Sequence, residues 1–234
     1  MSRCDPTAVA FGIVLSLSLA PATGVAQITL SGTAAVSRVE HLVDIGYGVE
    51  ESSGLLLDVE GAVTFRSRLQ LTMRAAGGSL STDTPGGESR DVGEVGIEAS
   101  FVPARWLALR GSAMSRTYST AIARQRWTIV EVGAEARLDF ATYPVRGILR
   151  GGVLPVVSVS GLPRPAVALT AAAGIEYRSG PVAGALFYGL ERYDFPDQGA
   201  GRRLEQVSTL TFRFTVQRAG PRAGPARVTT ATHR

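Results

Sequence analysis

Hydrophobic and polar residues alternate along most of this chain. The stretch WTIVEVGAEARLDF (127–140) is the clearest example, with Val130, Val132 and the following apolar residues on one side of an extended backbone. The opposite side carries Glu131, Glu135, Arg137 and Asp139. A period of two over this length predicts a β-strand. One strand fits either a soluble sandwich with the charges in water or a membrane barrel with the charges in the lumen.

The rest of the chain repeats this pattern and favours the barrel. Each alternating segment has about the ten residues that a tilted strand needs to cross a bilayer. The segments are 28–39, 55–65, 68–77, 91–102, 106–118, 127–140, 145–159, 166–178, 181–193 and 204–217. The first and ninth alternate least cleanly, so counts of eight or twelve strands stay open. We therefore predict an all-β protein, a closed antiparallel transmembrane β-barrel of about ten strands.

The connections between these segments alternate in length. The longer ones are expected at 40–54, 78–90, 119–126, 160–165 and 194–203. Short periplasmic turns and longer outer loops are typical of outer-membrane barrels. An even strand number then leaves both termini in the periplasm and the long loops outside the cell.

Aromatic residues of the apolar face gather beside the short turns. Such rings prefer the membrane interface and form a girdle there. The predicted girdle consists of Phe65, Phe101, Trp106, Phe140, Tyr143 and Tyr177. Tyr118, Trp127, Tyr188 and Tyr193 are the candidates for a second girdle at the other end.

The polar face predicts a network of charge pairs inside the barrel. Acidic and basic segments alternate, and cross-strand neighbours must lie on the same face. Plausible turn registers pair Glu60 with Arg74, Glu98 with Arg110, Asp139 with Arg146, and Glu135 with Arg150. The full predicted set is Asp58, Glu60, Arg68, Arg74, Glu94, Glu98, Arg110, Arg116, Glu131, Glu135, Arg137, Asp139, Arg146 and Arg150. The wet face of a soluble sheet would show the same ladder.

The two ends of the chain differ from the segments between them. Residues 1–26 combine Arg3, an apolar run and small residues before Ala26, which predicts a secretory signal peptide. Its removal would take away Cys4, the single cysteine. Residues 27–217 form the predicted barrel, and the Ala-, Gly- and Pro-rich segment 218–234 is expected to be a disordered basic periplasmic tail. The net charge of +4 comes largely from that tail, which argues against a nucleic-acid partner.

Signal, strands, girdle and last strand together resemble the small bacterial outer-membrane β-barrels, the group of OmpA-, OmpX- and OmpW-type proteins and the omptins. The last strand, STLTFRFTV, is similar to the signal that the barrel-assembly machinery reads in this group. The resemblance implies a monomer in the bacterial outer membrane, with outer-membrane lipid and the assembly machinery as partners. It matches the architecture and singles out no one family.

Three functions fit this architecture. We expect a charge-paired, closed lumen with a structural or surface-interaction role, because a barrel of this size is filled by its own side chains. The first alternative is a narrow channel for ions or small solutes, and a distant one is an outer-membrane hydrolase. An omptin-like site would need carboxylates and a histidine, but His41 reads as a solvated loop residue. No enzyme, cofactor or metal is therefore expected. Pro155 indicates a bulge or a lateral opening in its strand.

Overall fold

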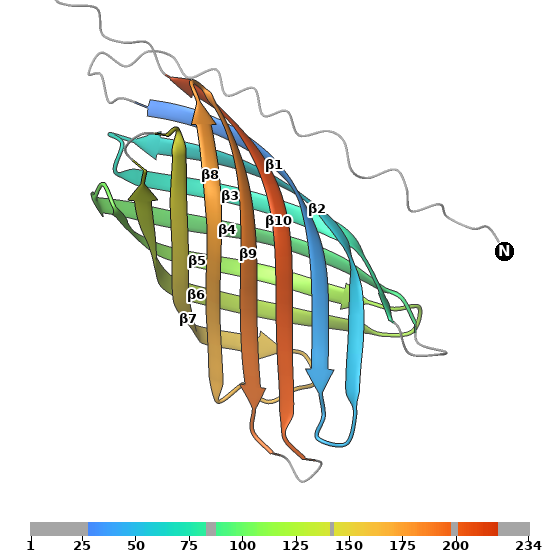
Figure 1. Cartoon of the computed structure of the whole chain (residues 1–234). Coiled ribbons are helices and arrows are strands. Elements are labelled where there is room, and N and C mark those ends of the chain that lie inside the picture. The colour runs from blue at the N-terminus through green and yellow to red at the C-terminus, as the bar shows by residue number, and fades with distance from the viewer. Residues whose placement is uncertain (1–27, 83–87, 141–142, 198–200, 220–234) are drawn as a thin grey trace, which may run out of the picture.

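The computed structural model describes residues 28–82, 88–140, 143–197 and 201–219, and these form one closed β-barrel (Figure 1). Every neighbouring pair of strands is antiparallel, and the first strand pairs with the last. The strands are β1 (Ile28–Asp44), β2 (Val49–Phe65), β3 (Leu69–Thr82), β4 (Arg90–Ala104), β5 (Leu107–Ser119), β6 (Arg124–Asp139), β7 (Val145–Val159), β8 (Val167–Ser179), β9 (Val182–Phe195) and β10 (Arg203–Ala219).

All ten predicted strands are present, and the predicted closed all-β barrel is confirmed. No helix in the described residues is long and apolar enough to cross a membrane. The predicted signal peptide and most of the predicted tail lie outside the described residues. Arg218 and Ala219, assigned to the tail, belong to β10.

Four of the five predicted long loops are too long, and the one expected at 160–165 is confirmed. Of the expected loop 40–54, only residues 45–48 connect the two strands, because Asp44 pairs with Val49 and the ladder continues from there. The loops predicted at 78–90 and 194–203 likewise contain the ends of their strands. Backbone pairing needs no apolar alternation, so the strands run on past the point where the hydrophobic pattern fades.

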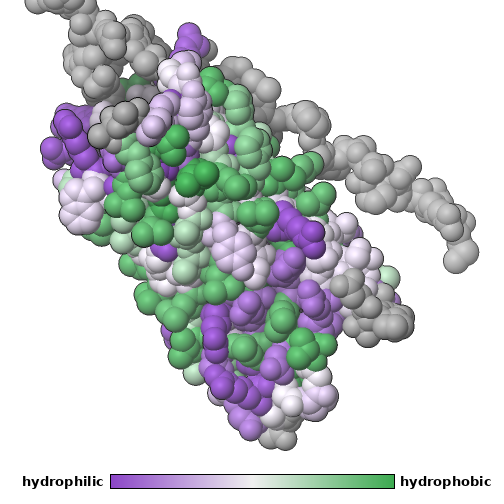
Figure 2. Space-filling model, in the orientation of Figure 1, coloured by the Kyte–Doolittle hydropathy of each residue, from purple (hydrophilic) through white to green (hydrophobic). Residues whose placement is uncertain are grey.

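The outer wall of the barrel is apolar. Leu55, Leu57 and Val59 of β2 are each more than 60% exposed, and large hydrophobic residues are exposed on the other strands as well. The space-filling view shows hydrophobic side chains over much of this wall (Figure 2). The alternating face that carries the charges points inward.

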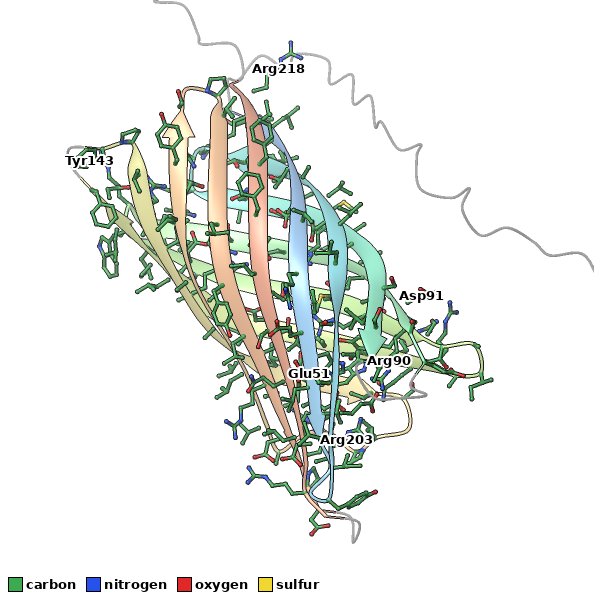
Figure 3. The ribbon with its side chains drawn as sticks, turned by 45° about the vertical axis from the view of Figure 1, so that its right-hand side comes forward. Glu51, Arg90, Asp91, Tyr143, Arg203 and Arg218 are labelled. Carbon is green, nitrogen blue, oxygen red and sulfur yellow. The ribbon has the colours of Figure 1, made fainter. Side chains whose placement is uncertain are left out.

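The six predicted girdle aromatics are exposed beside the short turns, on or next to the ends of their strands. Their names and exposures are Phe65 38%, Phe101 45%, Trp106 61%, Phe140 52%, Tyr143 71% and Tyr177 54%. Tyr143 and Arg218 lie at one end of the barrel, with Glu51 and Arg203 at the other (Figure 3).

The second girdle is wrong for three of its four members. Tyr118, Trp127 and Tyr193 are buried inside the barrel, and only Tyr188 is exposed on the wall. Strict alternation already places Trp127 on the same inward face as Glu131. The prediction was wrong because it relied on the position of Trp127 near the strand end.

Strand β7 carries the irregularity that Pro155 predicted. Val132 pairs with Val153 and Val130 with Val156, so β7 has one more residue than β6 over this interval. That is a β-bulge. Pairing of β7 with β8 stops at Val153, which faces Leu169.

Candidate functional site

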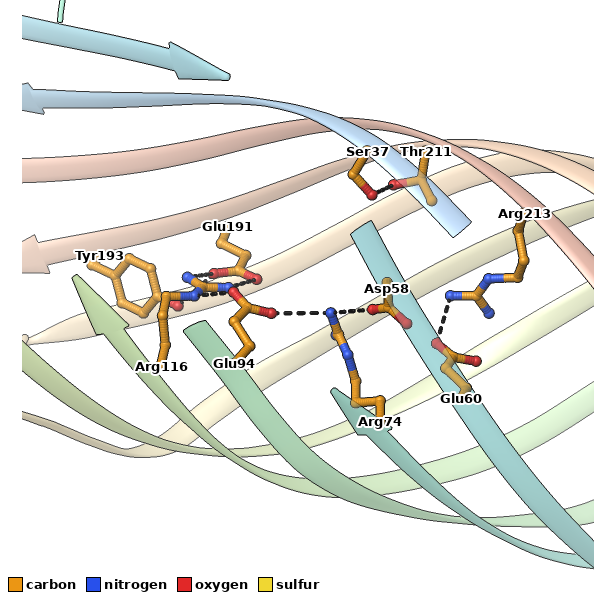
Figure 4. Close-up of polar contacts among 10 residues, drawn as sticks. All are labelled: Ser37, Asp58, Glu60, Arg74, Glu94, Arg116, Glu191, Tyr193, Thr211 and Arg213. Atoms are coloured by element: carbon orange, nitrogen blue, oxygen red, sulfur yellow. Dashed lines mark hydrogen bonds and ion pairs between the residues drawn. The ribbon is translucent and has the colours of Figure 1, made fainter. Parts of the chain in front are cut away.

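The interior of the barrel is the candidate functional site. A belt of charged side chains crosses its middle: Asp58, Glu60, Arg74, Glu94, Arg116, Arg150, Glu191 and Arg213. Arg116 of β5 is the most buried cation of this belt. Its Nη1 and Nη2 donate to Glu191 of β9 at 2.7 and 3.0 Å, and its Nε donates to Glu94 of β4 (Figure 4). Tyr193 donates a further hydrogen bond to Glu191, at 2.7 Å.

The network continues from Glu94 toward β2. Arg74 lies 3.0 Å from Glu94 and 2.8 Å from Asp58, so it bridges two nearly buried carboxylates. Glu60 stands opposite Arg74 in the predicted register. Its carboxylate nevertheless binds Arg213 of β10, at 3.0 Å. The predicted register between β2 and β3 is therefore confirmed, but Glu60 forms its ion pair with Arg213 and not with Arg74.

A second group of pairs lies nearer to the short turns. Arg150 and Arg137 both donate to Glu135, at 2.7 and 2.6 Å, and Arg146 donates to Asp139 at 2.6 Å. The cross-strand register here is the predicted one.

Glu98 and Arg110 also form an ion pair, although their predicted register is wrong. A shift between Phe101 and Ala104 sets Glu98 opposite Ser112 instead of Arg110. The long guanidinium side chain reaches the carboxylate along the diagonal.

Two predicted members of the network form no ion pair with a described residue. Arg68 lies exposed in the β2–β3 turn and not in the wall. Arg66 and Ser67, just before it, have φ values of 48° and 56°. Phe65 pairs with Leu69, so the connection has three residues and Arg68 lies outside the β2–β3 ladder. Glu131 lines the interior and has no ion pair to any described residue within 4 Å.

Sequence reasoning missed the contributions of β9 and β10. Glu191, Tyr193 and Phe187 share the inward face of β9, and the ring of Phe187 has Arg150 and Arg213 at 4.7 and 5.5 Å from its centre. Alternation was the available signal, because residues an even number of positions apart on a strand share a face, as Phe187, Glu191 and Tyr193 do.

The belt borders a cavity of about 470 Å³ on the side of the short turns. Its lining is mainly polar and runs from Arg68 and Gln217, near that end, past Arg150 and Arg213 in the belt to Ile129, Leu154 and Tyr193. We call it the polar vestibule.

On the other side of the belt the interior is mainly apolar, apart from the buried His41, Ser52 and Glu205. Trp127, Tyr193 and Phe195 are at most 2% exposed, and their rings meet edge to face. We call this cluster the apolar layer: Val39, Leu56, Leu80, Val92, Tyr118, Trp127, Ile129, Leu154, Val157, Val159, Tyr193, Phe195 and Val207.

The reading of His41 as a solvated loop residue is wrong. It lies within β1, is 2% exposed, and stacks on Tyr118 with ring centres 5.1 Å apart. Its Nε2 lies 3.1 Å from a carboxylate oxygen of Glu205, which also pairs with Arg203. The hydroxyl of Ser52 lies 3.5 Å from the His41 main-chain oxygen and makes no hydrogen bond to the ring nitrogens.

Within the described part of the chain, no group of three His, Cys, Asp or Glu residues has a spacing that could hold a metal ion. The carboxylates of the belt instead face arginines.

No protein-family model and no curated protein sequence matches the chain. Among solved structures, the outer-membrane protease OmpT of Escherichia coli is similar, with a TM-score of 0.50 and 8% identity over 83% of this chain and 97% of that chain. The translocator domain of the autotransporter NalP of Neisseria meningitidis gives 0.44 and 13% over 82% and 88%. Neisserial surface protein A gives 0.39 and 9% over 80% and 96%. At such identities the likeness concerns the fold alone, and the chain has the fold of the small bacterial outer-membrane β-barrel proteins.

Proposed function

We propose that the chain is an integral β-barrel of the bacterial outer membrane with a closed lumen and a structural or surface-interaction role. The apolar wall supports the membrane location. Side chains such as Leu57 and Met73, 69% and 65% exposed, would face water in a soluble protein. Lipid removes that surface from water, which is worth roughly 25 cal/mol for each Å² of apolar area.

The apolar layer, which is stacked on the charged belt, is the observation that supports a closed lumen. An ion would have to pass packed rings such as Trp127, at 1% exposure, and leave water to do so. Moving a charge into an apolar region without partners is costly. The ion pairs below the layer hold their arginines and carboxylates to one another.

The proposal includes an orientation. The end with the short turns and both ends of the described chain faces the periplasm, and the opposite loops face outward, as in other barrels of this kind. The exposed Tyr47 and Ile122, 81% and 88%, lie in those outward loops and are available for surface contacts. We further propose a monomer that is inserted by the barrel-assembly machinery.

We also propose that the protein is not an enzyme. His41 is the one histidine among the described residues, and it is enclosed by Tyr118 and Glu205. A hydrolase would need this ring within reach of a substrate and of a nucleophile, and Ser52 contacts its main-chain oxygen instead.

A narrow channel is the second candidate, because the polar vestibule already hollows the half of the lumen nearest the short turns. In that case the apolar layer would be a gate that opens to let solutes pass. Hydrophobic constrictions of this kind are known to gate channels by dewetting.

Single-channel recording of the refolded protein in a planar bilayer distinguishes the two candidates. We expect no conductance from the wild-type protein. We expect steady conductance from a variant with Trp127→Ala and Phe195→Ala, which removes two rings of the apolar layer. Trp106→Ala is the matched control, because that ring lies on the outer surface. A mobility shift between boiled and unboiled gel samples establishes that each protein is folded. Steady wild-type conductance that changes with Glu98→Ala or Arg110→Ala would make the channel the correct function.

A further inference from the structure

A smaller cavity lies between the charged belt and the apolar layer. Its volume is about 160 Å³, the room of about five water molecules. Leu56 and Val207 of the apolar layer line one side, and Asp58, Arg74 and Arg213 of the belt line the other. We call it the inner chamber.

The polar groups of this chamber are not all satisfied. Four buried side-chain atoms in the described residues have no hydrogen-bond partner: His41 Nδ1, Asp58 Oδ1, Arg74 Nε and Arg213 Nε. Three of them belong to residues that line the inner chamber. Leaving a buried donor or acceptor unsatisfied costs free energy, so three such atoms on residues that line one cavity call for water or a bound polar ligand there.

The three atoms differ in what they can bind. Asp58 places one carboxylate oxygen on Arg74 at 2.8 Å and keeps the other free. Arg74 and Arg213 use their terminal nitrogens on carboxylates and keep their Nε–H donors free. Asp58 lies between the two arginines in the close-up (Figure 4). The chamber therefore offers two cationic donors beside one anionic acceptor.

The other charges around the chamber already have partners. Arg116 is held by Glu94 and Glu191, and Arg150 by Glu135. A lone anion would leave the free oxygen of Asp58 unmet, and a lone cation would leave the two donors unmet. Water, which both donates and accepts, can bind all three atoms, and so can one ligand that carries both charges.

We propose that the inner chamber binds a small zwitterion, an α-amino acid with a small apolar side chain. Its carboxylate accepts from Arg74 Nε and Arg213 Nε, and its ammonium donates to the free oxygen of Asp58. Its side chain packs against Leu56 and Val207. Binding is non-covalent and leaves the net charge of the belt unchanged.

The ligand reaches the chamber from the polar vestibule. Arg74, Arg213 and Phe187 line both cavities, so the two meet at these side chains. A site reached from one end of the barrel does not require a conducting lumen, so this inference stands apart from the proposed function and can fail without it.

Equilibrium dialysis of the refolded full chain in detergent, with radiolabelled L-valine as the probe, tests the proposal. We expect saturable binding of one valine per barrel. N-acetylvaline lacks the ammonium and valinamide lacks the carboxylate, so each should compete at least about tenfold more weakly. Asp58→Asn should weaken valine binding by a similar factor. Asp139→Asn, which alters a pair outside the chamber, is the matched control and should leave binding unchanged.

Two results would overturn the proposal. The first is no saturable binding by a correctly folded barrel up to about 10 mM valine, where even a site with a dissociation constant of about 1 mM is mostly filled; the chamber would then hold water alone. The second is competition by N-acetylvaline as strong as that of valine itself. Because the second comparison uses the wild-type chain, it decides the matter even if Asp58→Asn fails to fold.

Discussion

Arg116 shows how a single buried side chain joins distant strands. It is 5% exposed and contacts carboxylates on β4, its neighbour, and on β9, across the lumen. A buried guanidinium between two carboxylates adds little over an apolar core, but removing one partner of such a group leaves charge without compensation.

Arg116→Ala should therefore be strongly destabilising. It leaves Glu94 with Arg74 alone and takes both charged hydrogen bonds from Glu191, so we expect a loss of about 3–5 kcal/mol in the free energy of unfolding. Guanidinium unfolding in detergent micelles, followed by far-UV circular dichroism, measures it.

Arg146→Ala is the control, because its partner Asp139 is 62% exposed at the side chain. Exposed pairs are worth about 0–1 kcal/mol. Equal unfolding midpoints for both variants would mean that the belt contributes no more than surface charges do.

The sequence could predict which residues share the lumen, but not every contact among them. Alternation and the short turn predicted that Glu135 pairs with Arg150, because that turn fixes the register of the two adjacent strands that carry them. They could not predict that Glu60 binds Arg213, because β10 becomes a near neighbour of β2 only when the barrel closes through β1. The contact of Glu191 on β9 with Arg116 on β5 also joins strands that are not neighbours, although alternation alone already places Glu191 on the inward face.

At the scale of the elements, β7 is the least supported part of the wall. Its pairing with β8 ends at Val153, and Pro155 has no N–H to donate. The side chain of Arg164 donates to the main-chain oxygen of Pro155. Residues 154–159 of β7 consequently depend on β6 and on the packing of Leu154 and Val157 in the apolar layer.

Hydrogen exchange should reveal this difference. Amides in residues 154–159 that point away from β6 have no strand partner, so we expect this half of β7 to exchange faster than residues 145–153. Mass spectrometry of peptides from the folded barrel in micelles measures both halves in one experiment. Equal protection along β7 would show that the seam toward β8 is closed by contacts other than those described.

The element scale also explains the error about the loops. Hydrophobic alternation reports where a strand meets lipid or a filled lumen, and it fades where a strand projects beyond the apolar wall. Strands β1 and β2 continue as a paired ladder up to Asp44 and Val49, so their outer ends looked like loop.

At the scale of the whole molecule, the apolar side chains occupy two places. Most form the outer wall, and a smaller group forms the apolar layer inside. The sequence predicted the wall because its pattern is continuous around the barrel. It did not predict the layer, because Trp127 and Tyr193 near the strand ends resemble girdle residues until their inward direction is known.

The two tryptophans of the chain test this arrangement most directly. Trp106 is 61% exposed beside a short turn and Trp127 is 1% exposed inside. Each single-tryptophan variant, Trp127→Phe or Trp106→Phe, is refolded into vesicles that contain brominated phospholipid, and its fluorescence quenching is measured. We predict strong quenching of Trp106 and almost none of Trp127, together with a blue-shifted emission from Trp127. Quenching of Trp127 by the lipid, with Trp106 unaffected, would mean that the lumen and lipid faces are the reverse of those described.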